Sequence, residues 1–413
     1  MSRDPALRVL PLAWIAWGLA AIFYAYGFFH RVAPSVLVDD LMLAFRLDAG
    51  GVGSLSAAYF YAYAACQIPI GMAIDRFGPR RLIIVAALAA SLAGLAFVSA
   101  GTAALAWVAR ASIGAAVGVG YIAAITMASI WFPPHRFARM VGLTLTVGLS
   151  GALLAQVPLE GLRELFGWRL AVAIGTGFGV VIALAMALAV PERRGAVEGR
   201  DPGMSGLGQL LREPRLWLAG LYTGAMGAAP LAFAGLWCVP YFEQVHGLDR
   251  IQAGGLASMM LAAWALGGPL WGGFSDRIAR RSRPMVAASA LLVAGWLPFL
   301  LGDQLPLALL IGALAAIGFA AGGMVIAFAF AAEQVKAGGA GLIAGLVNSS
   351  VLLVGAVMQS AMGWTLDWFW AGDFADGVRV YDARAFTAAL FLLVAAAASA
   401  FIAALAMGEM DPG

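Results

Sequence analysis

Charged residues are scarce in this sequence of 413 residues. Only 11% of the residues are Asp, Glu, Lys or Arg, whereas about 25% is usual in soluble domains. Hydrophobic residues make up 62% of the chain. This composition excludes an ordinary soluble domain and indicates an integral membrane protein.

Cysteine and histidine are also rare. Cys66 and Cys238 lie in apolar segments of opposite halves, so we expect two buried thiols rather than a disulfide or a metal pair. The three histidines, His30, His135 and His246, are scattered along the chain. No nucleophile with a base, metal cluster or phosphate loop is evident, so we expect neither enzymatic activity nor a cofactor.

Twelve apolar segments are long enough to cross a bilayer, which takes about 20 residues of α-helix. The first is too long for a cleavable signal peptide, so we expect the N-terminus to stay attached. No ten-residue alternation suggests a barrel, and the sequence therefore predicts an all-α protein with twelve transmembrane helices. They cover residues 9–38, 51–74, 82–100, 103–132, 137–162, 168–190, 216–242, 251–274, 285–301, 305–332, 342–369 and 385–407.

Basic residues predict the orientation of these helices. Lys336 is the one lysine among 25 basic residues. We count 17 basic residues in the N-terminus and the loops after even-numbered segments, 7 on the opposite side, and Arg110 inside a segment. The positive-inside rule then places both termini in the cytoplasm, and we expect the cell's inner (cytoplasmic) membrane.

A polar segment at 191–215, rich in Gly, Pro and charge, divides the chain into bundles of six helices at 1–190 and 216–413. A repeated motif supports this division. "GMAIDRFGPRR" at 71–81 and "GGFSDRIARR" at 272–281 each follow the second helix of their half. Such duplication is typical of transporters whose substrate site lies near the bilayer midplane.

The duplicated motif resembles that of the major facilitator superfamily. Matching positions in the first copy are Gly71, Asp75, Arg76, Gly78, Arg80 and Arg81. The second copy keeps Asp276 and Arg277 but has Ala279 in place of the second glycine. "RASIGAAVG" is also similar to an Arg-x-x-x-Gly motif of the family, at Arg110 and Gly114. The resemblance implies two pseudo-symmetric bundles, transport by alternating access, and a gate at both motif copies; alternatively, these arginines only enforce topology.

Arg110 is a candidate functional residue because an arginine inside a membrane helix is costly and normally faces a cavity or a partner. It lies ~10 Å inside the outer boundary of its segment, and Tyr121 shares its helix face. We expect either a substrate ligand or a brace bonded to an acid or a backbone carbonyl. Glu160 is the nearest plausible acid.

Arg31 lies at a similar depth if the first helix continues to Val38. Tyr24, Arg31 and Ser35 then form one stripe. The alternative is a boundary residue at the membrane surface. The sequence resembles organic-anion and metabolite carriers of the superfamily, some of which place a substrate arginine here, and by that resemblance Arg31 is a candidate anion ligand.

Further candidates lie on other helices. Trp237, Asn348 and Gln359 sit on helix faces of the second half, where they either contact the substrate or pack between helices. His30 and Glu160 are candidates for coupling to protons. No Asp or Glu lies near the centre of a predicted span, unlike the pattern of many proton-coupled drug exporters.

Two arginines without a central acid predict an electropositive cavity. The leading interpretation is a secondary transporter of a small anionic or zwitterionic solute, coupled to protons, sodium or a counter-anion. We expect a monomer in the lipid bilayer, with no nucleic-acid partner. Alternatives are an exporter of hydrophobic or cationic compounds and a ligand sensor that does not transport.

Overall fold

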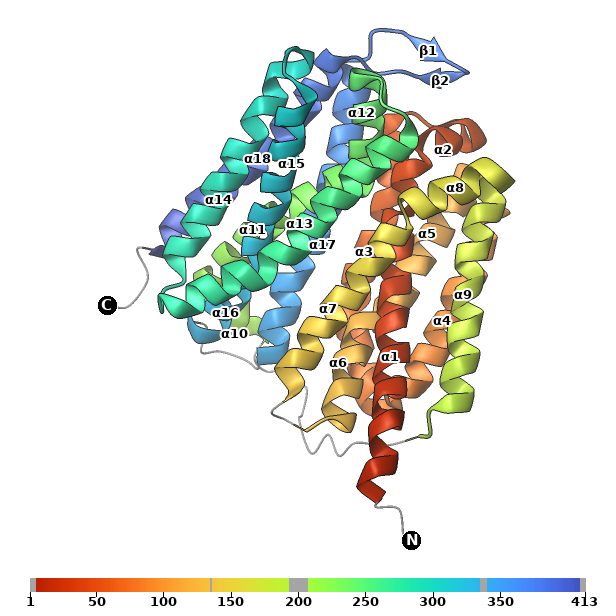
Figure 1. The fold of residues 1–413 in the computed structure, drawn as a ribbon, viewed down its shortest axis with the longest axis vertical. Coiled ribbons are helices and arrows are strands. Elements are labelled where there is room, and N and C mark those ends of the chain that lie inside the picture. The colour runs from red at the N-terminus through yellow and green to blue at the C-terminus, as the bar shows by residue number, and fades with distance from the viewer. Residues whose placement is uncertain (1–4, 134–135, 193–206, 335–339, 409–413) are drawn as a thin grey trace. The chain divides into compact units, whose positions relative to one another are not determined.

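The structure, a computed structural model, describes residues 5–133, 136–192, 207–334 and 340–408. These residues are almost entirely helical (Figure 1). Eleven of their helices, some composed of two or three consecutive elements, are long and apolar enough to cross a membrane. Helix α3 (Ala49–Phe77) is a twelfth if its two arms, bent by 55°, count as one span. The predicted all-α membrane fold is confirmed.

The first half of the chain holds nine α-helices and a short 3-10 helix among its described residues. In chain order they are α1 (Pro5–Val32), η1 (Ala33–Val36), α2 (Val38–Phe45), α3, α4 (Pro79–Val98), α5 (Ala103–Val117), α6 (Val119–Trp131), α7 (Phe137–Leu154), α8 (Val157–Phe166) and α9 (Trp168–Ala189).

The second half adds nine α-helices, three short non-α helices and a two-stranded hairpin in its described part. They are α10 (Leu207–Leu210), α11 (Pro214–Ala228), the π-helical η4 (Ala229–Trp237), α12 (Cys238–His246), α13 (Arg250–Arg277), α14 (Ser282–Trp296), η5 (Leu297–Gln304), α15 (Leu307–Ala321), η6 (Gly322–Met324), α16 (Val325–Gln334), α17 (Ala340–Trp368), β1 (Phe374–Ala375), β2 (Val378–Arg379) and α18 (Ala383–Gly408).

Proline and glycine explain most breaks within the spans. The bend in α3 falls at Pro69, which cannot donate a backbone hydrogen bond. Gly118 separates α5 from α6, and Pro230 lies at the start of the π-helical segment. Helix α2 and the β1–β2 hairpin were not predicted, because both are short elements between spans.

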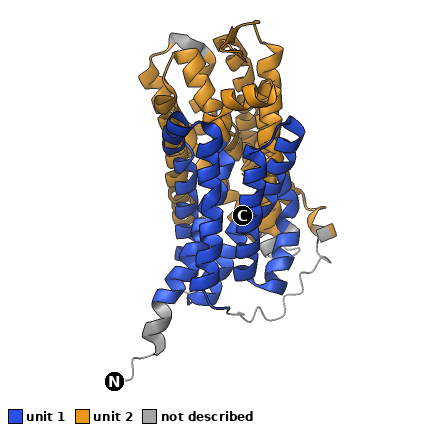
Figure 2. Cartoon of the chain, turned by 90° about the vertical axis from the view of Figure 1, so that its right-hand side faces the viewer, with its two compact units in different colours: residues 1–33, 62–201 blue, residues 34–61, 202–413 orange. Residues whose placement is uncertain are grey.

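Contacts divide the chain into two compact units (Figure 2). Unit 1 contains residues 1–33 and 62–201, and unit 2 contains residues 34–61 and 202–413. Residues 34–61 thus belong to the first half of the sequence but pack with the second half. Residues 193–206 of the proposed linker lie outside the described part, and the boundaries 1–190, 191–215 and 216–413 remain a prediction.

Helix pairing within the two units supports pseudo-symmetry. In unit 1, α1 packs against α7 and α4 packs against α9. In unit 2, α11 packs against α17 and α14 packs against α18. In each half these are pairings of the first span with the fifth and of the third with the sixth. The same pairing scheme therefore occurs twice.

Glycines permit the closest helix crossings. A Cβ atom on Gly151 of α7 would lie 1.8 Å from the carbonyl oxygen of Ala25 in α1, and a Cβ on Gly267 of α13 would lie 2.2 Å from that of Phe319 in α15. Membrane helices associate through such small residues, because lipid supplies no hydrophobic force that drives helices together.

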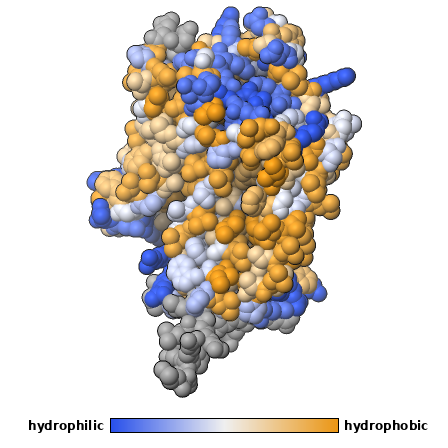
Figure 3. Space-filling model, turned by 45° about the vertical axis from the view of Figure 1, so that its right-hand side comes forward, coloured by the Kyte–Doolittle hydropathy of each residue, from blue (hydrophilic) through white to orange (hydrophobic). Residues whose placement is uncertain are grey.

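Large apolar side chains remain exposed on the outside of the helices, including Leu92 (71% exposed) and Leu188 (85% exposed). Hydrophobic residues cover much of the face shown in Figure 3. Such exposure is unfavourable in water, and it fits contact with lipid acyl chains.

Candidate functional site

Arg31 lies one residue before the end of α1 and is buried, with 7% of its surface exposed. Its guanidinium carbon lies 4.3 Å from the ring centroid of Phe28 and 5.3 Å from that of Tyr63 in α3. Cation–π attraction of this kind stabilises a desolvated guanidinium. This burial favours a binding residue over a surface boundary residue, while the role itself remains a prediction.

The rings beside Arg31 continue into an aromatic cluster in unit 1, formed by Tyr24, Phe28, Tyr63 and Tyr121. The Tyr24 centroid lies 5.1 Å from that of Phe28 and 5.3 Å from that of Tyr121 in α6. The structure therefore brings together three of the predicted site residues, Tyr24, Arg31 and Tyr121, through direct ring contacts and through Phe28.

Two glycines give Tyr24 its place. A Cβ atom on Gly148 of α7 would lie 2.5 Å from the Tyr24 ring, and a Cβ on Gly120 of α6 would lie 3.0 Å from the Tyr24 Cα. Any larger residue at position 148 would displace the ring. The sequence thus positions Tyr24 through small residues on α6 and α7, both of which pack against α1.

Arg110 makes a different set of contacts. It lies in α5 with 2% of its surface exposed, and its Nη1 donates a hydrogen bond to the His30 carbonyl oxygen at 2.7 Å. An α-helix would supply this oxygen with the N–H of residue 34, but Pro34 has none. Arg110 therefore acts as a side-chain cap on α1, which favours the brace over the ligand, although neither role has been tested.

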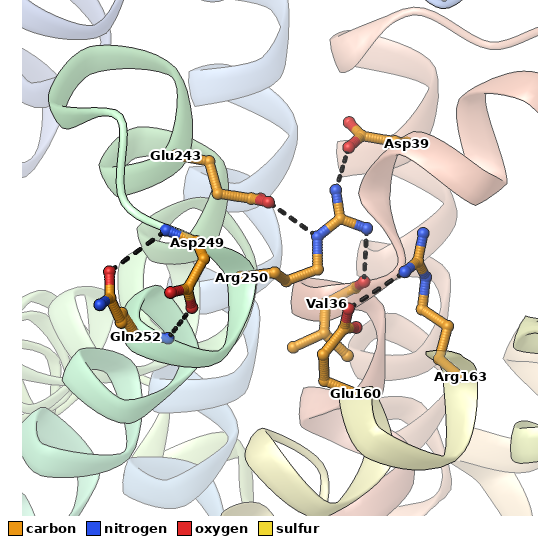
Figure 4. A network of polar contacts seen from close by, with 8 residues as sticks. All are labelled: Val36, Asp39, Glu160, Arg163, Glu243, Asp249, Arg250 and Gln252. Atoms are coloured by element: carbon orange, nitrogen blue, oxygen red, sulfur yellow. Dashed lines mark hydrogen bonds and ion pairs between the residues drawn. The ribbon is translucent and has the colours of Figure 1, made fainter. Parts of the chain in front are cut away.

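His30 is buried in α1. Its ring makes an edge contact with Tyr26 at a centroid distance of 4.5 Å, and the Tyr26 hydroxyl donates to the carbonyl oxygen of Thr176 in α9 at 3.1 Å. Glu160 in α8 is buried and forms an ion pair with Arg163 at 3.0 Å (Figure 4). The coupling roles of His30 and Glu160 remain predictions.

In unit 2, hydrogen bonds join two of the remaining predicted residues. The Trp237 indole Nε1 donates to the Gln359 carbonyl oxygen at 3.0 Å, and Gln359 Nε2 donates to the carbonyl oxygen of Leu231 at 2.8 Å. Asn348 is half-buried on α17, and Ser35 is buried in η1. The bonds of Trp237 and Gln359 fit helix packing, so whether they also contact the substrate stays open.

The first copy of the duplicated motif ties the start of α4 to the end of α9. Arg80 donates to the carbonyl oxygens of Val190 and Ala187 at 2.5 and 2.7 Å, and Arg81 pairs with Glu192 at 2.7 Å. Gly78 adopts φ +80°, in the left-handed region that favours glycine. The other motif residues comprise the half-buried Gly71 and the exposed Asp75 and Arg76.

The second copy forms an ion-pair cluster. Arg281 pairs with Asp276 and with Glu333 of α16, each at 2.6 Å. The hydrogen bonds to Glu333 and Asp276 raise the pKa of the Arg281 guanidinium. Arg277 is exposed. Glu192 and Glu333 were not predicted as partners, because pairing over more than 50 residues leaves no local pattern; gating by either copy remains a prediction.

A second polar network lies in unit 2, around the start of α13. Arg250 forms ion pairs with Asp39 of α2 and with Glu243 of α12, the latter at 2.8 Å (Figure 4). These residues lie far apart in the sequence but within one compact unit. The bridge therefore joins the segment that follows the first span to the second half of the chain.

Asp367 at the end of α17 caps the start of α3. Its carboxylate accepts hydrogen bonds from the backbone N–H groups of Ala49 at 3.2 Å and Gly50 at 2.7 Å. Tyr381 donates its hydroxyl proton to the same carboxylate at 2.6 Å. Burial and this hydrogen bond raise the pKa of Tyr381. Because Ala49 and Asp367 lie 318 residues apart, no local sequence pattern predicts this cap.

Comparison with known proteins places this architecture in a family. The family model described as Major Facilitator Superfamily matches residues 16–360. The chain belongs to the major facilitator superfamily. It is therefore a multi-pass membrane transporter, as the duplicated motif suggested.

Individual proteins of known name are distant relatives of this chain, at 25% sequence identity. The chain is 25% identical over 303 residues to the probable sulfoacetate transporter SauU of Cupriavidus necator, covering 67% of this chain and 68% of that protein. It is 25% identical over 398 residues to the probable nitrate/nitrite transporter NarK2 of Mycobacterium tuberculosis, and the match covers 94% of this chain and 96% of that protein.

The fold is similar to a crystal structure described as a bacterial homologue of the human lysosomal transporter Spinster, in an inward-facing and unoccupied conformation. The TM-score is 0.76 at 18% identity, covering 96% of this chain and 97% of that one. At this identity the likeness concerns the fold alone.

Proposed function

We propose that this protein is a secondary transporter that moves a small organic anion across the cytoplasmic membrane by alternating access. The observation that carries the proposal is the buried Arg31, stacked against Phe28 and Tyr63. A guanidinium in a membrane helix recognises carboxylate, sulfonate or phosphate groups through paired hydrogen bonds.

The distribution of acidic residues supports an anion over a cation. In the described spans, acidic side chains lie near helix ends, and Glu160, six residues before Phe166 at the end of its span, lies deepest. That carboxylate is already paired with Arg163. A cationic drug would therefore meet no free acid deep in these spans, which disfavours the alternative of a cation exporter.

The relatives support the same class of solute. The names of two of them refer to sulfoacetate and to nitrate or nitrite, all of which are anions. We carry over only the negative charge, because the sequences are 25% identical and the ligands differ in size.

Alternating access fits the contacts of residues 34–61. Within unit 2, Asp39 pairs with Arg250, and Ala49 and Gly50 donate to Asp367. Residues 34–61 precede the linker and their partners follow it, so rocking of one half of the chain against the other must break these bonds. The motif copies at Arg81 and Arg281 are the proposed gates on the cytoplasmic side.

Uptake into proteoliposomes tests the function. The purified protein is expected to move a labelled small carboxylate or sulfonate down a gradient, and imposed proton, sodium or counter-anion gradients identify the coupling ion. Binding without movement of any anion would instead favour a sensor. Labelling of cysteines introduced at the two ends of the chain tests whether both termini are cytoplasmic.

A further inference from the structure

We propose that a groove between α2 and the β1–β2 hairpin binds the headgroup phosphate of an acidic phospholipid. The groove encloses about 380 Å³ and lies within unit 2. Its lining includes the apolar side chains of Leu43, Leu47 and Phe374 and the charged side chains of Arg46, Asp48 and Arg379. This lipid site is separate from the binding of the transported anion and does not depend on it.

The groove lies at the level where α17 leaves the membrane. The hairpin joins the last two spans, at the end of unit 2 opposite the second motif copy (Figure 1). Arg379 of the groove forms an ion pair at 3.0 Å with Asp367, in the last turn of α17. The next residue, Trp368, is 85% exposed. Because tryptophans are enriched at the membrane–water interface, we place lipid headgroups at this level.

Arg46 gives the groove a positive charge without a counter-charge. Its side chain is exposed and makes no ion pair or hydrogen bond with the described residues. Arg379 is instead paired with Asp367, and its Nη1 lies 3.7 Å from Asp48 Oδ2. The Asp48 carboxylate also accepts a hydrogen bond from Gly51 N–H at 2.8 Å. A phosphate in the groove would therefore meet Arg46 as an available partner for charge-assisted hydrogen bonds.

The backbone of Arg46 also points to a role for its side chain. Arg46 ends α2 in the left-handed region, with φ +52°. Glycine is favoured at such a helix end, because a side chain is strained there. The chain thus keeps an arginine where glycine would fit better, although the guanidinium bonds to none of the described residues. Strained backbone of this kind is concentrated at functional sites, and a bound anion explains it here.

The apolar part of the lining fits the acyl chains of a lipid. Leu43 is 51% exposed and Phe374 is 63% exposed. The Phe374 ring makes an edge contact with Trp370 at a centroid distance of 4.9 Å, and the Trp370 ring lies 4.3 Å from the guanidinium carbon of Arg379. Large exposed apolar side chains are unfavourable in water. An acyl chain can cover them while its phosphate pairs with Arg46, whereas a small inorganic anion would leave them exposed.

A lipid in this groove would connect distant parts of the chain. One wall comes from residues 42–48, after the first span, and the other comes from residues 374–379, between the last two spans. A ligand that binds only the folded protein stabilises it by mass action. We therefore expect an acidic lipid to raise the unfolding temperature of the wild type.

Photo-crosslinking of the purified full-length protein in nanodiscs tests the location of the site. The probes are photoactivatable phosphatidylglycerol and the matched phosphatidylcholine, whose headgroup has no net charge. We expect phosphatidylglycerol to label peptides with residues 42–47 or 374–379 about fivefold more strongly, the effect of one arginine at an anionic membrane surface. Labelling by phosphatidylglycerol should fall about fivefold in Arg46→Gly and stay within about twofold in Arg46→Lys.

Two comparisons separate lipid binding from folding. Arg384→Gln is the control for charge and should keep the labelling, since Arg384 is also an exposed arginine of unit 2 but does not line the groove. Glycine adopts the left-handed conformation without strain. Without acidic lipid, Arg46→Gly should therefore unfold at the wild-type temperature or above it. A lower unfolding temperature together with lost labelling would make Arg46 a structural residue and overturn the proposal.

The remaining outcomes also decide the question. Equal labelling of these peptides by phosphatidylcholine, or no labelling of them by either probe, would overturn an acidic-lipid site. Complete competition by soluble glycerol phosphate would assign the groove to a free phosphate compound and overturn the lipid as its occupant. Anion uptake is measured separately in proteoliposomes, so failure of the lipid site would leave the proposed transport function standing.

Discussion

Arg110 Nη1 donates to the backbone carbonyl oxygen of His30 at 2.7 Å, in the turn where Pro34 removes the α-helical donor. An arginine that sequence motifs present as a candidate ligand is thereby engaged as the cap of a broken helix. The Arg31 guanidinium lies elsewhere, beside the rings of Phe28 and Tyr63 in the aromatic cluster.

Replacement of Arg110 by Met should destabilise the protein, because a buried carbonyl without a partner costs about 1–3 kcal/mol. Pro34→Ala restores the N–H of residue 34, so the loss should be smaller in the double variant. Thermal unfolding of the four proteins of this cycle in detergent measures the coupling between the two sites.

A matched control is Arg169→Met. Arg169 also donates to a carbonyl oxygen, that of Val98, but is exposed to the surroundings. Its loss should change the free energy of unfolding by less than about 1 kcal/mol. If Arg110→Met lowered the unfolding temperature equally in the wild type and in Pro34→Ala, Arg110 would not stabilise α1 by capping the His30 carbonyl oxygen.

The cap on α3 should be energetically important as well. Asp367→Ala removes the carboxylate that accepts from Gly50 N–H, and it leaves Ala49 N–H with the Tyr381 hydroxyl oxygen as acceptor. We expect the free energy of unfolding to fall by about 1–2 kcal/mol. Asp367→Asn keeps one acceptor oxygen, so its free energy of unfolding should fall by less than that of Asp367→Ala. Asp373→Ala, in the exposed loop that follows, serves as the control in unfolding experiments; a loss as large as that of Asp367→Ala would argue against a specific cap.

Tyr381 should make stability fall at alkaline pH. Its pKa is raised in the folded protein, so the native state holds the phenol proton more tightly than the unfolded chain does. The stabilisation is fully present below the unfolded pKa of about 10 and is lost as the pH rises above it. The difference in unfolding temperature between the wild type and Tyr381→Phe should therefore shrink from about pH 8 to about pH 11, whereas a constant difference would disprove the titration.

The first motif copy should respond unequally to loss of its two arginines. Arg80→Ala removes bonds to two carbonyl oxygens at the end of α9 and should cost about 1–2 kcal/mol. Arg81 and Glu192 form an exposed pair, so Arg81→Ala should cost less than about 1 kcal/mol. The unfolding temperatures of the two variants test this order. A larger decrease for Arg81→Ala than for Arg80→Ala would contradict the greater structural importance of Arg80.

Much of the fold follows from local sequence. Apolar segments of about twenty residues can be recognised from the sequence alone. The duplicated "DR" motif at Asp75 and Asp276 predicted the two halves. Prolines are also visible in the sequence, but whether Pro69 bends a helix or Pro230 begins a π-helical segment depends on neighbouring helices.

The candidate site was less predictable. Spacing along one helix placed Tyr24 and Arg31 on one stripe, and contacts with Phe28 support that grouping. Spacing could not show that Arg110 caps α1, because the acceptor of its hydrogen bond is a backbone oxygen 80 residues away in the sequence. The pairing of Arg250 with Asp39 and the cap by Asp367 could not be predicted for the same reason, because the partners lie far apart in the sequence.

The most direct test of the account is uptake of benzoate by proteoliposomes containing the wild type, Arg31→Lys, Arg31→Met or the control Arg169→Met. We expect Arg31→Met to lose at least tenfold in rate while it unfolds within a few degrees of the wild type, because its aliphatic stem still packs. Arg31→Lys should keep part of the activity, since it retains the charge but not the paired donors. Transport by Arg31→Met at the wild-type rate would contradict the central claim that Arg31 binds the anion.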